Sequence, residues 1–151
     1  MGWAVIRFTI PGEPQGKGRA RIGRIAGHAR MFTPAKTLAY EGLVAQMAQQ
    51  AMAGAALLAG PVVMEADILF TVPRSASRKV RADSLAGLMR PTKKPDTDNV
   101  IKALCDGMNG VVWRDDVQVV ELRVSKRFAE VPGVVVSVAP LQQPDLLAEA
   151  A

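Results

Sequence analysis

Apolar and polar residues alternate with a period of two in two parts of the chain, as they do in half-buried strands. The first part is residues 3–10, which end at Pro11 and Gly12. The second, residues 62–72, is the clearest strand, with Glu65 and Asp67 on the side opposite its apolar residues. Shorter apolar runs predict further strands at 117–126 and 134–139. The inward residues of the clearest strand are Met64, Ala66, Ile68, Phe70 and Val72.

A helical period appears in two other segments. Thr33 as N-cap and Pro34 at the first helical position predict the start of a long helix over residues 34–58, which Gly60 and Pro61 end. A second helix is expected at 99–109, with Asp98 as its N-cap. We expect Leu38, Leu43, Met47 and Met52 of the first helix and Val100, Ile101, Leu104 and Met108 of the second to face the core.

The remaining segments are basic and irregular. Residues 14–30 are rich in glycine and arginine and predict a loop or irregular hairpin, while residues 73–94 predict a mobile arm with a short helix at 80–89. The order of elements implies an α+β fold with a mixed sheet of about four to five strands and two main helices. We expect one domain over residues 1–140, followed by a flexible tail at 141–151.

Composition narrows the class of protein. Hydrophobic residues make up 49% of the 151 residues and charged residues 22%, which is typical of a globular protein. A single cysteine, Cys105, excludes an internal disulfide and favours a reducing compartment. No signal peptide or membrane span is visible, so we expect a cytoplasmic protein.

The net charge is +5, and the positive charge is concentrated in two blocks. Such blocks favour a polyanionic partner, and nucleic acid is the commonest one. We expect phosphate contacts from the N-terminal block and from the end of the second. These candidate DNA-binding residues are Lys17, Arg19, Arg21, Arg24, Arg30, Lys93 and Lys94. His28 has no partner at a spacing that suits metal binding or catalysis.

Acidic residues gather around the second helix. Asp96 and Asp98 are two residues apart, and in extended chain their side chains would point to the same side. Lys102 lies one turn into the helix and would point back toward both of them, and Asp115 and Asp116 follow the next turn. Carboxylates are the ligands that Mg²⁺ prefers, so this cluster predicts a divalent-cation site. Taken singly, each motif is more often a helix cap or a solvated turn.

This region closely resembles the signature of the RusA-type Holliday junction resolvases, a phage and bacterial family of crossover-junction endodeoxyribonucleases. The resemblance extends over about residues 5–138. It includes the Asp-x-Asp-Asn motif, the lysine four residues later, the Asp-Gly helix end and the Trp-x-Asp-Asp-x-Gln turn. The matching residues are Asp96, Asp98, Asn99, Lys102, Asp106, Gly107, Trp113, Asp115, Asp116 and Gln118.

The resemblance implies a homodimer that binds four-way DNA junctions and nicks two opposing strands with Mg²⁺ or Mn²⁺. It assigns the metal to Asp96, Asp98 and Asp116, and catalysis to these three residues together with Lys102. The residues alone do not choose between Asp115 and Asp116.

Two other functions fit the same sequence. One is a basic DNA-binding accessory protein of phage origin whose acidic residues are structural. The other is a branched-DNA nuclease with less structural selectivity. The number of metal ions and the nucleotide preference stay open.

Overall fold

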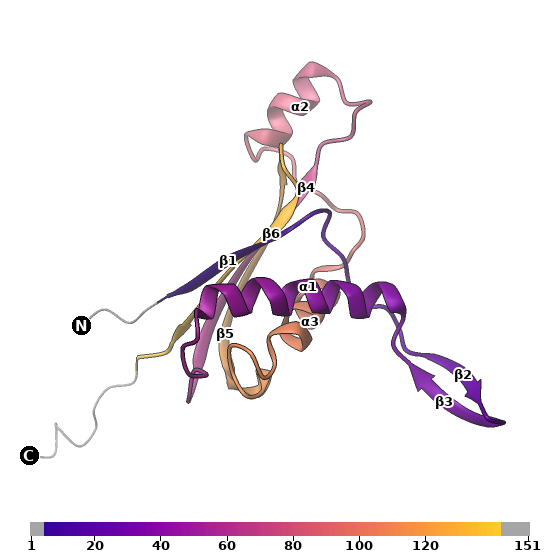
Figure 1. Ribbon diagram of the computed structural model, residues 1–151. Coiled ribbons are helices and arrows are strands. Elements are labelled where there is room, and N and C mark those ends of the chain that lie inside the picture. The colour runs from indigo at the N-terminus through magenta and orange to yellow at the C-terminus, as the bar shows by residue number, and fades with distance from the viewer. Residues whose placement is uncertain (1–4, 143–151) are drawn as a thin grey trace, which may run out of the picture.

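The described part of the chain, residues 5–142 of a computed structural model, is organised around one mixed sheet (Figure 1). The order of its strands is β1-β6-β4-β5; β4 and β5 are parallel, and the other neighbours are antiparallel. A separate antiparallel pair, β2 and β3, lies outside this sheet. The strands are β1 (Ile6–Pro11), β2 (Arg21–Ile25), β3 (His28–Phe32), β4 (Val62–Thr71), β5 (Val119–Ala129) and β6 (Gly133–Pro140).

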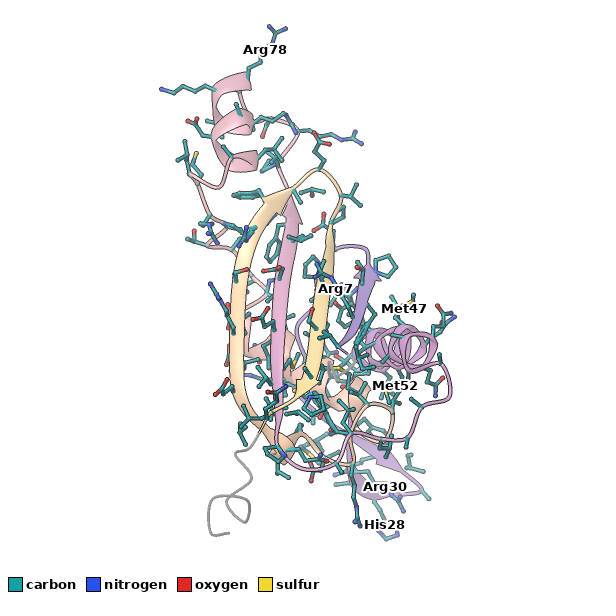
Figure 2. The ribbon with its side chains drawn as sticks, turned by 90° about the vertical axis from the view of Figure 1, so that its left-hand side faces the viewer. Arg7, His28, Arg30, Met47, Met52 and Arg78 are labelled. Atoms are coloured by element: carbon teal, nitrogen blue, oxygen red, sulfur yellow. The ribbon has the colours of Figure 1, made fainter. Side chains whose placement is uncertain are left out.

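Two helices, α1 (Ala35–Met52) and α3 (Thr97–Met108), lie side by side on one face of the sheet, and the short α2 (Arg78–Leu85) lies near one end of it (Figure 1). No helix of the described part crosses the face of the sheet that Figure 2 turns toward the viewer. The core lies between the sheet and the two covering helices. Its largest fully buried side chains include Trp113, Phe70, Ile10, Met64, Ile68, Leu104 and Met108. The predicted α+β class is therefore confirmed.

The contact between α1 and α3 depends on Gly107. A Cβ at this position would lie 2.7 Å from the Val44 side chain and 2.9 Å from the Glu41 carbonyl oxygen. The two helices therefore approach more closely than any larger residue at position 107 would allow.

We expect Gly107→Ala to destabilise the fold by about 1–3 kcal/mol, because the added methyl group overpacks a tight contact. Gly42→Ala is the matched control, since Gly42 is an exposed position of α1 with nothing within 4 Å of an added Cβ. That control should be neutral or stabilise by up to about 1 kcal/mol through helix propensity. Urea unfolding of both variants measures the difference, and equal stabilities would contradict the close contact.

The first helix differs from its prediction in length and in orientation. It ends at Met52 and not at residue 58, because Ala53 (φ 48°) and Gly54 (φ 79°) adopt left-handed conformations that stop a helix. Pro34 and not Thr33 is the N-cap, without a side-chain cap. Leu38 is 54% exposed, so its predicted burial is wrong. The buried face is instead Thr37, Tyr40, Val44, Ala48 and Met52.

The other boundaries shift by a few residues. Helix α3 begins at Thr97 with Asp96 as N-cap, so Asp98 lies inside the first turn and is not the cap. Residues 116–118 form a 3-10 turn, and β5 then pairs with β4 as far as Ala129, beyond the predicted end at residue 126. The strand expected at residues 62–72 is confirmed as β4.

The two basic segments are more regular than predicted. Residues 21–32 form a regular hairpin, with a two-residue turn at Ala26 and Gly27, both of which have positive φ. In the segment expected to be a mobile arm, α2 begins at Arg78 and ends at Leu85, and the residues after it are fastened to β5. Arg90 Nη1 donates to the Lys126 carbonyl at 3.0 Å, and Lys126 Nζ donates to the Lys93 carbonyl at 2.7 Å. Residues 1–4 and 143–151, including most of the predicted tail, lie outside the described residues.

Candidate active site

The segment after β1 runs between the beginnings of α1 and α3. The Lys17 backbone N–H donates to the Asn99 carbonyl at 3.0 Å, and the Gly18 N–H donates to Thr37 Oγ1 at 2.9 Å. A Cβ at Gly16 would lie 3.0 Å from Asn99 Cβ, and one at Gly18 would lie 2.8 Å from Thr37 Oγ1. Glycine at these positions thus lets a basic segment lie directly against both helix starts.

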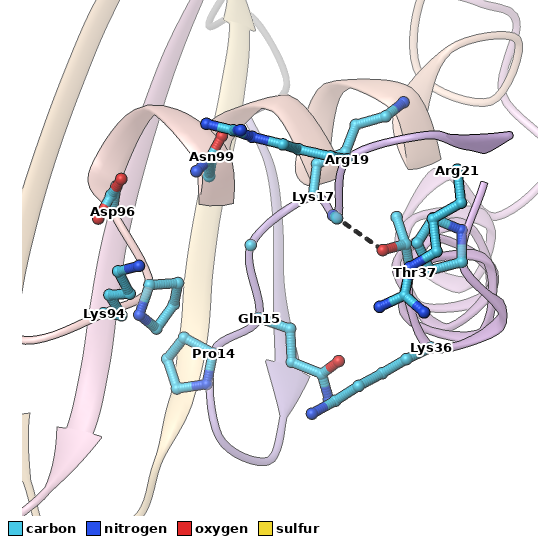
Figure 3. A pocket seen from close by; sticks show the side chains of 14 residues that line it. Pro14, Gln15, Lys17, Arg19, Arg21, Lys36, Thr37, Lys94, Asp96 and Asn99 are labelled. Carbon is cyan, nitrogen blue, oxygen red and sulfur yellow. Dashed lines mark hydrogen bonds between the residues drawn. The ribbon is translucent and has the colours of Figure 1, made fainter. Parts of the chain in front are cut away.

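A pocket of about 600 Å³ lies at this junction (Figure 3). Five cationic residues line it, and Asp96 is the only acid among the described residues that line it. The pocket therefore combines positive charge with one carboxylate at the N-terminal end of α3, where the helix dipole adds further positive potential. Its cationic residues are Lys17, Arg19, Arg21, Lys36 and Lys94.

Asp96, Asp98 and Lys102 follow one another along the first turns of α3. All three are exposed, and Asp96 makes no side-chain capping hydrogen bond to the helix. Within residues 5–142, neither aspartate takes part in an ion pair. Lys102 lies four residues after Asp98 and so occupies the same face of the helix. Two carboxylates are thus left without a cationic partner beside a basic pocket.

Asp116 lies at the opposite end of α3. Trp113 Nε1 donates to Asn109 Oδ1 at 2.7 Å, and Asn109 Nδ2 donates to Asp116 Oδ2 at 3.5 Å. The 12 residues of α3 lie between Asp96 and Asn109, a separation of about 18 Å along the helix axis. Asp116 thus contacts the end of α3 through Asn109, and its charge is close enough to raise the pKa of the Cys105 thiol.

No three His, Cys, Asp or Glu side chains within residues 5–142 form a group that could hold a metal ion. The expected convergence of Asp96, Asp98 and Asp116 is thus not found in the described chain. Asp96 and Asp98 are also not joined by extended chain, as the sequence had suggested, because Thr97 and Asp98 are already helical.

The turn that carries Asp115 and Asp116 is fixed by Gln118. Its Oε1 accepts from the Arg114 N–H at 3.0 Å, and its Nε2 donates to the carbonyls of Leu58 and Gly60 at 2.9 and 3.0 Å. Asp115 is exposed, whereas Asp116 is half-buried against α3. Asp116 is thus the one of the pair that contacts the helix.

Lys17 is held by acidic side chains that the sequence did not single out. Its ammonium group pairs with Asp106 and lies 3.5 Å from Glu41 Oε1. The hydrogen bond to Asp106 raises the pKa of Lys17 above its ordinary value. Part of the charge of Lys17 is therefore neutralised within the protein.

Cys105 lies in the same helix as Asp106. Burial, with the charges of Asp116 and Asp106, raises the pKa of the Cys105 thiol to about 12, so this thiol stays protonated.

The other predicted DNA-binding residues fall into three places. Arg19, Arg21 and Lys94 line the pocket. Arg24 and Arg30 lie on the exposed hairpin. Lys93 lies over the Phe70 ring, with its ammonium nitrogen 5.5 Å from the ring centroid, and the ammonium nitrogen of Lys126 is 5.2 Å from the same centroid.

Lys36, Asn99 and Lys126 also belong to this region and were not predicted as site residues. Lys36 and Asn99 line the pocket, and Lys126 Nζ donates to the Pro95 carbonyl at 3.1 Å. The position of Lys36 beside the Thr33-Pro34 helix start offered a signal. Lys126 offered none, because it is 31 positions from Pro95 in the sequence and meets it only in the folded protein.

Comparisons with known proteins agree with the resemblance seen in the sequence. The profile of the family described as "Endodeoxyribonuclease RusA" matches residues 11–139. A similar protein is the "Uncharacterized protein YqaN" of Bacillus subtilis (strain 168), which is 38% identical over 135 residues, covering 88% of this chain and 94% of that protein. In the described residues, no helix has the length and apolar character needed to cross a membrane. The extent of the family match shows that the chain belongs to the RusA endodeoxyribonuclease family.

Proposed function

We propose that this protein is a metal-dependent endonuclease that resolves Holliday junctions by paired nicks in opposing strands, acting in DNA recombination and repair. The observation that supports this most directly is the pocket that is lined by Arg19, Arg21, Lys36 and Lys94 together with Asp96. Cations of this kind bind phosphates, and the carboxylate beside them lies where a backbone phosphate would be held.

The donor atoms of Asp96 and Asp98 fit Mg²⁺, and Mn²⁺ by the same chemistry. Both are hard carboxylates without a cationic partner in the described residues, and Mg²⁺ is commonly bound through one or two carboxylates together with substrate phosphates. When bound, the metal would supply an activated water and neutralise phosphate charge. The inclusion of Asp116 in this set rests on the family resemblance alone.

The chain's own residues would bind and orient the DNA. The pocket arginines and Lys94 would hold the phosphate, while Lys102, on the face of Asp98, would stabilise negative charge that develops on the leaving oxygen. Because a four-way junction has two-fold symmetry, a homodimer with one site in each subunit would place two cuts symmetrically.

Cleavage of matched substrates tests this proposal. The labelled four-way junction, a linear duplex of the same sequence and a forked duplex are incubated with the protein and Mg²⁺. We expect symmetric nicks in opposing strands of the junction and little cutting of the other two. Comparable cutting of all three would instead indicate a less selective branched-DNA nuclease.

A second candidate is a DNA-binding accessory protein without catalysis, which would use the cations of the pocket and of the hairpin to bind phosphates. The same assay separates the two functions. Junction binding in Mg²⁺ and Mn²⁺ without any nicks would support the accessory protein.

Lys102→Ala should lower the rate of junction cleavage by about a hundredfold, because one charge-stabilising donor is lost. Lys102 is exposed, so the free energy of unfolding should change by less than about 0.5 kcal/mol. Single-turnover cleavage and urea unfolding measure the two effects, and Lys102→Arg should retain part of the rate. An unfolded Lys102→Ala protein would show that the role of this residue is packing.

A further inference from the structure

The β2–β3 hairpin projects from the body of the protein (Figure 1). Its strands pair with each other and make no extensive contact with another helix or strand of the described chain. A two-stranded hairpin alone is only marginally stable in water, so an extended hairpin of this kind is expected to be completed by a partner.

One face of the hairpin carries an apolar pair. Ile22 lies directly opposite Met31 in the register, so the two side chains share a face, and they are 76% and 66% exposed. Phe32, in contrast, has a packing partner within the hairpin. Its ring lies over Gly23, where an added Cβ would come within 2.8 Å of the ring. Ile22 and Met31 are therefore left without a packing partner on one face of the projecting hairpin, next to its base and away from the turn at Ala26 and Gly27.

The charges around this pair indicate what covers it. The hairpin holds Arg21, Arg24 and Arg30 and no acidic residue. Arg24 lies two residues after Ile22 and so shares its face. Arg21 also lines the pocket that contains Asp96, so the hairpin continues the surface proposed to bind phosphates. An exposed apolar pair flanked by arginines fits a partner that carries negative charge and also exposes apolar surface. A nucleic acid whose bases are partly unstacked is such a partner.

We propose that Ile22 and Met31 form an apolar wedge that enters the crossover of a DNA junction and contacts unstacked bases, while the hairpin arginines hold the flanking phosphates. Apolar side chains inserted between base steps unstack and bend DNA in this way. The inference rests on the proposed DNA-binding function, to which it adds the residues that would contact the bases.

The test uses a four-way junction that carries 2-aminopurine beside the crossover, in EDTA so that no cleavage occurs. The wild-type protein should raise the fluorescence about twofold or more as the base leaves its stack. Ile22→Thr/Met31→Thr, which keeps the β propensity of both strands, should abolish this rise. Its affinity for the junction, measured by anisotropy, should stay within about tenfold of wild type, because phosphate contacts dominate binding.

Two matched variants complete the design. Ile22→Leu/Met31→Leu keeps the apolar surface and should keep the rise in fluorescence. Val120→Thr makes the same kind of change at an exposed position of β5 and should leave the rise intact. A threonine variant that still raises the fluorescence, a leucine variant that loses the rise, or a wild type that binds without any rise would overturn the wedge.

Cleavage is measured separately, in Mg²⁺. Unstacking of the junction in EDTA without any cleavage in Mg²⁺ would support the wedge and contradict the proposed nuclease activity. A wild-type protein that binds no DNA would contradict both the wedge and the nuclease proposal.

Discussion

Asp98→Asn should reduce junction cleavage by at least about a hundredfold while junction binding is retained. The substitution keeps the shape of the side chain and removes the charge that a divalent cation requires. Binding should persist because the pocket cations and the hairpin arginines are untouched. Loss of an acid from the first turn of α3 costs at most about 1 kcal/mol of helix-dipole stabilisation. Single-turnover cleavage and anisotropy on the same junction measure the two effects.

Asp96→Asn should behave in the same way, since its carboxylate lines the pocket and makes no capping hydrogen bond to the helix. Glu65→Gln is the matched control, because Glu65 is an exposed acid on β4 and lies far along the chain from these motifs. That control should cut the junction at the wild-type rate. Full activity in both aspartate variants would remove these residues from the metal site, and loss of binding in either would show a different role.

Trp113→Ala should destabilise the fold by about 3–5 kcal/mol, the usual cost of truncating a buried tryptophan. Trp113 is 0% exposed and belongs to the core, and its indole N–H donates to Asn109 Oδ1. For a domain of this size such a loss lowers the melting temperature by roughly 6–20 °C. Thermal unfolding followed by circular dichroism measures it.

Trp113→Phe separates packing from positioning. It retains most of the apolar volume and loses the hydrogen bond to Asn109, and should cost clearly less than Trp113→Ala. Since Asn109 in turn donates to Asp116, the Phe variant should loosen Asp116 while the core stays folded. Equal melting temperatures for Trp113→Ala and the wild type would contradict the central place of this side chain in the core.

The sequence predicted the elements well where one face of each is buried in a simple layer. Strand β4 lies in the middle of the sheet, between β6 and β5, and its alternation gave both its bounds and its inward residues. The inward face of α1 was harder to predict, because Thr37 is covered by the segment around Gly18, which comes from a different part of the chain. A polar residue buried by such a contact has no signature in the helical period.

The residues of the candidate site could likewise be predicted only where they are close together in the sequence. The position of Asp96, Asp98 and Lys102 on one short segment could be predicted, since sequence neighbours stay close in space. The contact of Lys17 with Asp106 could not, because these residues are 89 positions apart and meet only through the packing of α1 and α3. Asp116 was expected beside Asp96 and Asp98, and the contact that the structure gives it is with Asn109, which accepts a hydrogen bond from Trp113.

The central claim is that acidic residues at the start of α3 act on a DNA phosphate held in the basic pocket. Cleavage of a four-way junction over a Mg²⁺ titration, ended by excess EDTA, tests it most directly. We predict paired nicks in opposing strands that depend on Mg²⁺ and disappear on chelation. Cleavage that continues unchanged in EDTA, or no cleavage at any Mg²⁺ or Mn²⁺ concentration by a protein that binds the junction, would contradict it.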